Sequence, residues 1–434
     1  MTTEIKRLAP TRVELVIPIA VEDMQAAQDR AFRRLVKKAK LPGFRPGKVP
    51  RKIFEQNYGA QTIAAEAIED VVPEVYAKAV REHDLEPVDR PKMELERDEN
   101  GQPSRLKAVV EVRPDIALHE YKGLKLKRAV QAVTDEEVER SVQTLARERA
   151  TLVPVEREAR MSDVVTIDYE GTIDGQPFEG GSAKAQSAEL QEGRMLPGFA
   201  GGIVGMKAGD SKTIDVPFPD DYRQRDLAGQ TANFAITVHE VKEVELPQLD
   251  DAFAKAVSEN ETMEALRADI RRRLEAVAQA RSRRELGAQA VARIVEQHEF
   301  PLPATLVDRE LESMIGDAAA MAARMGVSFE DYLKATKKTE EQLREEYRPE
   351  AERRVRATLV LGAIAKAEKI TATAADIQDE LRALARQYGQ PVDRVRKALG
   401  NNVLPLMDGI VRGKTVDFLV EHASIEEATA GAPS

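Results

Sequence analysis

The sequence predicts a multidomain α+β protein made of an α+β domain, an all-β domain and a long helical region, in that order. Three observations predict this class. Alternating apolar residues flank a helical pattern near the start, tight-turn signals and period-two alternation fill the middle, and helical periodicity dominates from about residue 247. With 434 residues, of which 42% are hydrophobic, the chain is long enough for about three domains. The predicted limits are 1–118, 119–153 as a linker, 154–246 and 247–434.

The first domain is predicted as a small sheet that carries a helix–loop–helix. Alternation predicts strands at Val13 to Ile17, at Met93/Leu95 and at Leu106 to Val112. A helix is expected from about Val21 to Lys40, with acidic residues in its first turn and lysines in its last, as the helix dipole favours. Helix resumes after Pro50 and continues from about residue 59 to 82.

The loop at residues 43–50, Gly-Phe-Arg-Pro-Gly-Lys-Val-Pro, lies in a strongly basic stretch and is called the basic loop below. Residues 30–52 contain ten lysines and arginines and no acidic residue, although the whole chain has a formal net charge of −10. Segregated charge indicates a partner of the opposite sign. Phe44, expected at an exposed loop tip together with Arg45 and Lys48, suits docking to a polyanion that also has a hydrophobic crevice.

Three other interpretations of the basic loop fit its residues less well. A phosphate-binding P-loop requires four residues between its glycines and a Ser or Thr after the Lys, whereas this loop has three residues and Val49, so it is discarded. A solvated basic helix accounts for the charge but not for an exposed Phe44. Binding to free nucleic acid has weak support from one loop in an acidic protein.

The middle of the chain is predicted as a small sheet around one short helix. The expected linker contains a charged helix, 134–149, with a capping box at Thr134 and Glu137. Beyond it, Asp174-Gly175 signals a two-residue hairpin, and a short helix begins at Pro197-Gly198-Phe199. Aromatic residues converging from several strands predict a concave apolar pocket.

The last region is predicted as arm-like helical hairpins. Helices are expected at about 263–298, 303–325, 339–369, 374–388 and 392–420, with an interruption near Gly400, a capping box at Thr339 and a kink or restart at Pro349. Met314, Met321 and Met325 share one helix face, for which core packing is favoured over an adaptable surface that binds many different sequences. Residues 428–434 are expected to be disordered.

Composition excludes several classes of function. The absence of cysteine excludes disulfides and thiolate metal sites, and the five histidines lack metal-ligand spacing and are interpreted as surface residues. No nucleophile-elbow, dinucleotide or zinc-protease motif is present. With no signal peptide and no apolar run long enough to span a bilayer, the protein is expected in the cytosol, with no membrane, metal or cofactor.

The basic loop resembles the ribosome-docking signature of bacterial trigger factors, Gly-Phe-Arg-x-Gly-Lys-x-Pro, and the resemblance extends along essentially the whole chain. It implies a chaperone that works without ATP and holds nascent and unfolded polypeptides. The implied partners are a large-subunit ribosomal protein and rRNA at the exit tunnel, with a homodimer off the ribosome. The implied ribosome contacts are Phe44, Arg45 and Lys48, with Gly43 and Gly47 permitting the turn.

Residues 154–246 resemble FKBP-type peptidyl-prolyl isomerases, through Tyr169-x-Gly, Asp-Gly-x-x-Phe178-Glu179 and Met195-Leu196-Pro-Gly-Phe199 in order. The resemblance implies that X–Pro bonds are isomerised at a site whose residues are Tyr169, Phe178, Glu179, Met195, Leu196, Phe199, Phe218, Tyr222 and Phe234. The segment Ala185-Gln186-Ser187-Ala188 departs from the family by being polar, which predicts weaker activity on that side.

Two rival functions remain open at this stage. The first is a free-standing isomerase whose basic loop and helices serve oligomerisation, and the second is a nucleic-acid-binding regulator. Sedimentation with ribosomes separates the first from a ribosome-associated chaperone, and tight binding to bare duplex nucleic acid at physiological salt would favour the second.

Overall fold

The computed structural model describes residues 3–39, 41–42, 44–45, 47–98, 103–129, 132–191, 193, 195–220, 222, 224, 226–400 and 403–428. The expected contacts at Gly43 and the tail 429–434 lie outside these residues. The chain divides into two compact units. Unit 1 combines residues 1–129 with 282–434, and unit 2 is formed by residues 130–281.

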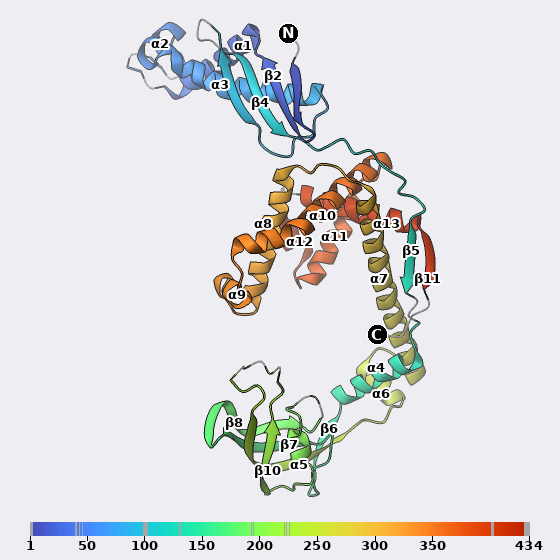
Figure 1. Cartoon of the computed structure of the whole chain (residues 1–434). Coiled ribbons are helices and arrows are strands. Elements are labelled where there is room, and N and C mark those ends of the chain that lie inside the picture. The colour runs from blue at the N-terminus through green and yellow to red at the C-terminus, as the bar shows by residue number, and fades with distance from the viewer. Residues whose placement is uncertain are drawn as a thin grey trace. The chain divides into compact units, whose positions relative to one another are not determined.

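The N-terminal part of unit 1 is a four-stranded antiparallel sheet with two long helices on one face (Figure 1). Leu15 and Ile17 point into a core shared with the helices, because alternate residues of a strand face the same side. The first strand was not predicted, and all its residues are exposed at the sheet edge. In spatial order the strands are β1 (Glu4–Ala9), β2 (Arg12–Pro18), β4 (Pro103–Glu111) and β3 (Lys92–Arg97).

The predicted helix–loop–helix is present. Helix α1 (Val21–Lys38) begins with acidic and ends with basic residues, as its dipole favours. After the basic loop come α2 (Arg51–Tyr58) and α3 (Ala60–Glu82). Gly59, with a φ of +83°, separates these two helices, because a residue with a side chain rarely adopts that angle.

Residues 119–153, predicted as a linker, form regular structure in both units. Strand β5 (Lys125–Ala129) in unit 1 pairs in parallel with β11 (Ser424–Ala428), a strand that was not predicted. Ala428, expected to be disordered, therefore ends a strand. In unit 2, helix α4 (Asp135–Glu148) has the predicted capping box. It packs Val138, Val142 and Ala146 against α6 (Asp251–Val257) and α7 (Met263–Gln297).

Unit 2 also contains a five-stranded antiparallel sheet, in which β6, β10, β7 and β8 follow in spatial order and β9 pairs with β10. The short helix α5 (Phe199–Ile203) packs into its core, as expected. The strands are β6 (Thr151–Pro154), β7 (Val164–Ile173), β8 (Gln176–Glu189), β9 (Ser211–Pro217) and β10 (Thr231–Glu245).

The remaining helices match most of the predicted ones. Helix α10 runs through Pro349 without ending, so the expected restart there is wrong, and packing of Val355 and Leu359 against α8 stabilises its continuous course. The short helices α6 and α9 were not predicted. The helices are α6 (Asp251–Val257), α7 (Met263–Gln297), α8 (Ala304–Arg324), α9 (Phe329–Thr336), α10 (Glu340–Ala367), α11 (Ala374–Gln387), α12 (Val392–Leu399) and α13 (Leu404–Glu421).

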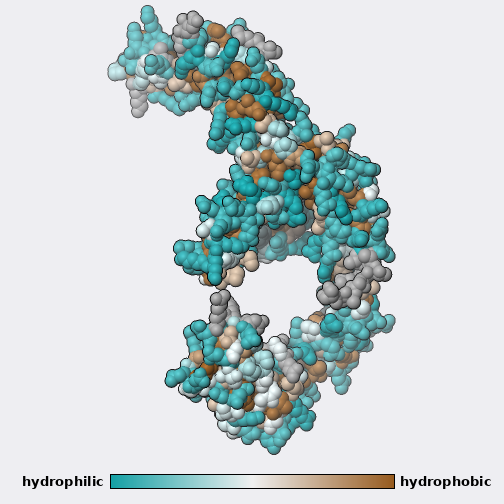
Figure 2. Space-filling view, viewed as in Figure 1, coloured by the Kyte–Doolittle hydropathy of each residue, from teal (hydrophilic) through white to brown (hydrophobic). Residues whose placement is uncertain are grey.

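The three methionines of α8 and its end differ in burial. Met314 is 9% exposed and belongs to the core with α10, as predicted, but Met321 and Met325 are 55% and 64% exposed. Core packing is therefore wrong for these two. Figure 2 shows hydrophobic residues in patches on a mostly hydrophilic surface. Among the described residues, no helix is long and apolar enough to cross a membrane.

Candidate functional site

Six aromatic rings from separate segments of unit 2 meet in its core, and we call them, together with Met195 and Leu196, the aromatic cluster. Phe234 on β10 lies at the centre, with its ring centroid 5.2 Å from that of Phe199, 6.0 Å from that of Tyr169 and 6.1 Å from that of Phe178. A second group joins Phe178 to Phe218 at 5.9 Å. The rings meet at steep angles, as the quadrupoles of aromatic side chains favour. The six rings are those of Tyr169, Phe178, Phe199, Phe218, Tyr222 and Phe234.

The aromatic cluster has a buried base and a partly accessible upper layer. Phe199, Phe218 and Phe234 are no more than 7% exposed. The other five members are only partly buried and pack against this base, and they are Tyr169, Phe178, Met195, Leu196 and Tyr222. The ring centroid of Tyr222 lies 4.7 Å from that of Phe218, with the two rings tilted at 59°, and this contact holds the phenol beside the cluster. The structure thus brings together eight of the nine residues predicted for this site.

Glu179, the ninth, follows Phe178 on β8 and is exposed to solvent. Gln186 and Ser187, the polar departure noted in the sequence, are also exposed, whereas Ala188 packs against the core. Ala185 adopts a φ of +50°, and its N–H donates to the Asp168 carboxylate at 2.6 Å. Because of this bond, and then of a second from His239, the pKa of Asp168 lies below its ordinary value.

Two glycines make the aromatic cluster possible, and sequence reasoning missed their role. A Cβ on Gly171 would lie 2.5 Å from Cε1 of Phe234, and one on Gly181 would lie 2.8 Å from Cζ of Phe178. Such distances are shorter than real carbon contacts allow, so both rings pack directly on glycine backbone. The Tyr169-x-Gly spacing was the available signal.

The basic loop presents its polar and aromatic tip to solvent. Phe44 is 37% exposed, which is high for a phenylalanine, and Arg45 and Lys48, which follow it in the loop, are also exposed. The loop is held at its base, since the N–H of Gly47 donates to the Val36 carbonyl at 2.9 Å. Gly47 has a φ of +83°, which explains the glycine there.

Some cations of the basic stretch are neutralised locally. Arg34 binds Glu66 and Asp70, and Arg51 binds Asp29 and Glu55. Six further cations form no ion pair with any residue the structure describes, and they are Arg33, Lys37, Lys38, Arg45, Lys48 and Lys52. The unpaired positive charge therefore gathers around the tip, while the pairs fasten α1 to α2 and α3.

One histidine differs from the sequence interpretation. His298, expected at the surface, is 1% exposed. Its Nδ1 donates to the Ile294 carbonyl at 2.6 Å, and its Nε2 accepts from the His119 backbone N–H at 2.9 Å. Both ring nitrogens are thus used structurally. Among the described residues, no group of His, Asp and Glu side chains is arranged to hold a metal ion.

Sequence comparisons assign each part of this architecture. Residues 155–240 match the family of FKBP-type peptidyl-prolyl cis-trans isomerases, in agreement with the sheet, the short helix and the aromatic cluster. The chain is therefore a multidomain protein with an FKBP-type isomerase domain. Residues 1–145 match the family described as bacterial trigger factor protein, and residues 262–421 match the trigger factor C-terminus.

Full-length relatives give the same answer. The trigger factor of Pelotomaculum thermopropionicum is 40% identical over 99% of both chains, and that of Carboxydothermus hydrogenoformans is 41% identical over 96% of this chain and 98% of the relative. This chain belongs to the bacterial trigger factor family, whose members are ribosome-associated chaperones. A solved structure of a trigger factor chaperone, 22% identical, shares the fold with a TM-score of 0.54 over 96% of this chain and 99% of that one.

Proposed function

We propose that the chain is anchored at the ribosomal exit tunnel through its basic loop, with residues 1–118 as the docking domain. Phe44, Arg45 and Lys48 would contact a large-subunit protein and rRNA, and Gly43 and Gly47 would permit the turn. The observation that carries this is the exposed Phe44 ring among cations that have no acidic partner in the described structure. Cations contribute attraction to phosphates, and the ring adds apolar contact.

Unit 2 would act on X–Pro bonds of the same client, through residues 154–246. The barrier to rotation about a peptide bond is ~18–20 kcal/mol because resonance stabilises the planar amide. The aromatic cluster excludes water from the proline and favours the twisted, less polar amide. The Tyr222 hydroxyl would donate to a substrate carbonyl, and Glu179 would orient hydrogen bonds at the rim. Rotation transfers no proton, so neither residue has to act as an acid or a base.

Residues 247–434 would hold unfolded client segments, with residues 119–153 joining the domains. Exposed apolar side chains of α8 and the following turn support this role, namely Met321, Met325 and Val327. Methionine adapts to many partners, and several weak contacts act together at high local concentration. We expect the protein to work in the cytoplasm without ATP, on nascent chains while it is docked and as a homodimer when it is free.

Sedimentation with ribosomes tests the anchoring. The variant Phe44→Ala/Arg45→Ala/Lys48→Ala should lose at least ten-fold in ribosome affinity while keeping its folded spectrum. The matched control Lys78→Ala/Lys92→Ala/Met93→Ala removes two cations and one exposed apolar side chain from the same domain, and should sediment like the wild type. Equal sedimentation of both variants would favour the free-standing isomerase instead.

A proline-limited refolding reaction tests the second activity. Phe199→Ala and Tyr222→Ala should each abolish the acceleration seen with the wild type. Phe199 belongs to the buried layer of the aromatic cluster, and Tyr222 carries the hydroxyl that would donate a hydrogen bond to the substrate. Tyr388→Ala, an exposed aromatic in the helical region, should leave the acceleration unchanged. Acceleration retained in Phe199→Ala would refute the assignment of this site.

A further inference from the structure

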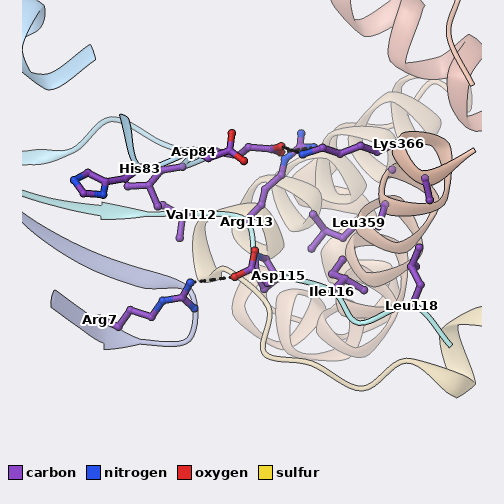
Figure 3. Close-up of a pocket in the computed structure, with 16 residues that line it drawn as sticks. Arg7, His83, Asp84, Val112, Arg113, Asp115, Ile116, Leu118, Leu359 and Lys366 are labelled. Carbon is purple, nitrogen blue, oxygen red and sulfur yellow. Dashed lines mark hydrogen bonds and ion pairs between the residues drawn. The ribbon is translucent and has the colours of Figure 1, made fainter. Parts of the chain in front are cut away.

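Unit 1 contains a pocket of about 630 Å³ that none of the functions above uses, and we call it the junction pocket. Three segments and Arg7 of β1 line it: the segments are the turn at residues 83–86 after α3, residues 112–118, and residues 359–367 of α10 (Figure 3). Its volume lies within the range of about 300–1,000 Å³ that ligand sites occupy. The pocket is therefore large enough to bind a ligand.

The backbone along one wall of the junction pocket is unpaired. The Arg113 N–H donates to the Glu86 carbonyl, and the His119 N–H donates to His298, each at 2.9 Å. Between these two anchors, no backbone N–H or C=O of residues 114–118 bonds to another residue in the described part of the chain. Exposed and partly buried side chains alternate from Arg113 to His119, as in a strand. This wall thus offers the hydrogen-bonding groups of an edge strand.

Where this segment meets α10, the junction pocket is apolar and has spare room. Ile116 and Leu118 face the pocket beside Leu359 of α10, and Figure 3 shows these three side chains together at one side of it. At Gly362, one turn further along α10, an added Cβ would meet no atom within 4 Å. A ligand side chain can therefore lie over Gly362 and contact Leu359.

The charges at the rim cancel one another. Arg7 binds Asp115 at 3.0 Å, on one side of the pocket. On the other side, Glu86 lies 3.2 Å from Lys366 and 3.7 Å from Arg113. The rim then carries three basic and three acidic side chains, namely Arg7, Arg113, Lys366, Asp84, Glu86 and Asp115. Such a rim does not favour a nucleotide or a phosphate, and it suits a ligand without net charge.

We propose that the junction pocket binds an extended, uncharged segment of an unfolded client polypeptide. The client backbone pairs with residues 115–118, since strand addition to an unpaired edge is a common mode of peptide recognition. Alternate client side chains then lie against Leu359 and over Gly362. The inference rests on the chaperone function, because the occupant is a client, and it adds a binding site that is separate from the aromatic cluster.

Hydrogen exchange on the full chain tests the pairing. The probe is a capped ten-residue peptide of alternating valine and threonine, which is uncharged and favours extended structure. Binding should slow exchange of the amides of residues 115–118 at least ten-fold. Gly362→Phe should fill the pocket and weaken peptide binding at least ten-fold, whereas Gly316→Phe, at an open position of α8 outside the pocket, should not.

The outcomes separate this inference from the chaperone function. If the peptide binds without slowing exchange at residues 115–118, and Gly362→Phe binds it like the wild type, the junction pocket is refuted while client binding elsewhere stands. If neither this peptide nor an unfolded protein binds the wild type anywhere, the chaperone function itself fails. Exchange is measured on the wild type, so the test does not depend on the folding of a variant.

Discussion

The aromatic rings of unit 2 owe their arrangement to positions that have no side chain at all. Phe234 packs against the backbone of Gly171, and Phe178 packs against Gly181. The distance between such a ring and the strand backbone is fixed, because neither the strand nor the close-packed core can move easily. Glycine at these two positions therefore sets where the Phe234 and Phe178 rings lie in the aromatic cluster.

We predict that Gly171→Ala displaces the Phe234 ring and lowers isomerase activity strongly. The added methyl group would lie 2.5 and 2.9 Å from two ring carbons and 3.0 Å from the Gly181 carbonyl oxygen. Overpacking of this kind costs about 1–3 kcal/mol of stability. The measurements are proline-limited refolding and urea unfolding of unit 2.

The control for this substitution is Gly201→Ala on α5. A Cβ there meets nothing within 4 Å, and alanine favours helix over glycine by about 1 kcal/mol. This variant should keep its activity and be at least as stable as the wild type. If the Gly171 and Gly201 variants behave alike, the packing argument is wrong.

His298 carries a second prediction at this scale. His298→Ala leaves a cavity and removes the partners of the Ile294 carbonyl and the His119 N–H, so we expect a loss of about 2–4 kcal/mol in unit 1. His119→Ala keeps its backbone N–H and should cost much less. Urea unfolding of both variants measures the difference, and equal losses would contradict the role given to the buried ring.

Helix α11 is stabilised at its first turn by one acidic residue. Asp376 accepts from the N–H and hydroxyl of Thr373 and from Lys414, each at 2.8 Å. The bond from Lys414, and then those from Thr373, lower the pKa of Asp376 from 3.8 to about 2. A carboxylate with a lowered pKa stabilises the folded state above its unfolded pKa, and this contribution is lost as the pH falls through the folded value.

We therefore predict that Asp376→Asn makes α11 less stable than in the wild type at pH 6. The gap between the two proteins should narrow as the pH is lowered from about 4 to about 2, because the wild-type carboxylate becomes protonated there. Exchange of the α11 amides as a function of pH measures this. The control is Asp379→Asn on the same helix, whose only partner among the described residues is nearby Arg382. A gap of constant size would show that Asp376 acts through something other than its charge.

Elements with local signals were predictable from the sequence. The capping boxes at Thr134 and Thr339 mark helix starts that the structure confirms, because the bonds join residues three positions apart. Strand β11 was missed, since its only strand partner lies about 300 residues earlier and no local pattern reports such a pairing. The short helices α6 and α9 contain too few residues for a clear period.

In the candidate sites, too, features with local sequence signals were predicted and features that depend on distant segments were not. The aromatic residues were named from their ordered spacing, and the structure brings them together. The exposure of Phe44 followed from its polar neighbours in the basic loop. The clash at Gly171 and the burial of His298 depend on segments distant in sequence, so the sequence alone did not predict them.

At the scale of the whole molecule, the order of segments along the chain does not match the division into compact units. Unit 1 is discontinuous, because residues 130–281 are inserted between its two parts. Strand β11 ties these parts together at the end of the chain. It pairs with β5 in parallel, and Ile425 packs against the core that contains Leu126 and Ile294. On the other edge of β5, the Gln289 side chain bonds both the N–H and the C=O of Lys127 at 2.9 Å.

This arrangement predicts that removing β11 weakens unit 1 but not unit 2. A chain that ends at Ala423 loses every β5–β11 pair and the partial burial of Ile425, a side chain whose full burial stabilises by about 1.5–3 kcal/mol. Exchange at β5 should rise and the urea midpoint of unit 1 should fall, while isomerase activity stays the same. A chain that ends at Ala428 keeps the strand and should match the wild type. If the shorter chain loses isomerase activity as well, the two units do not fold independently.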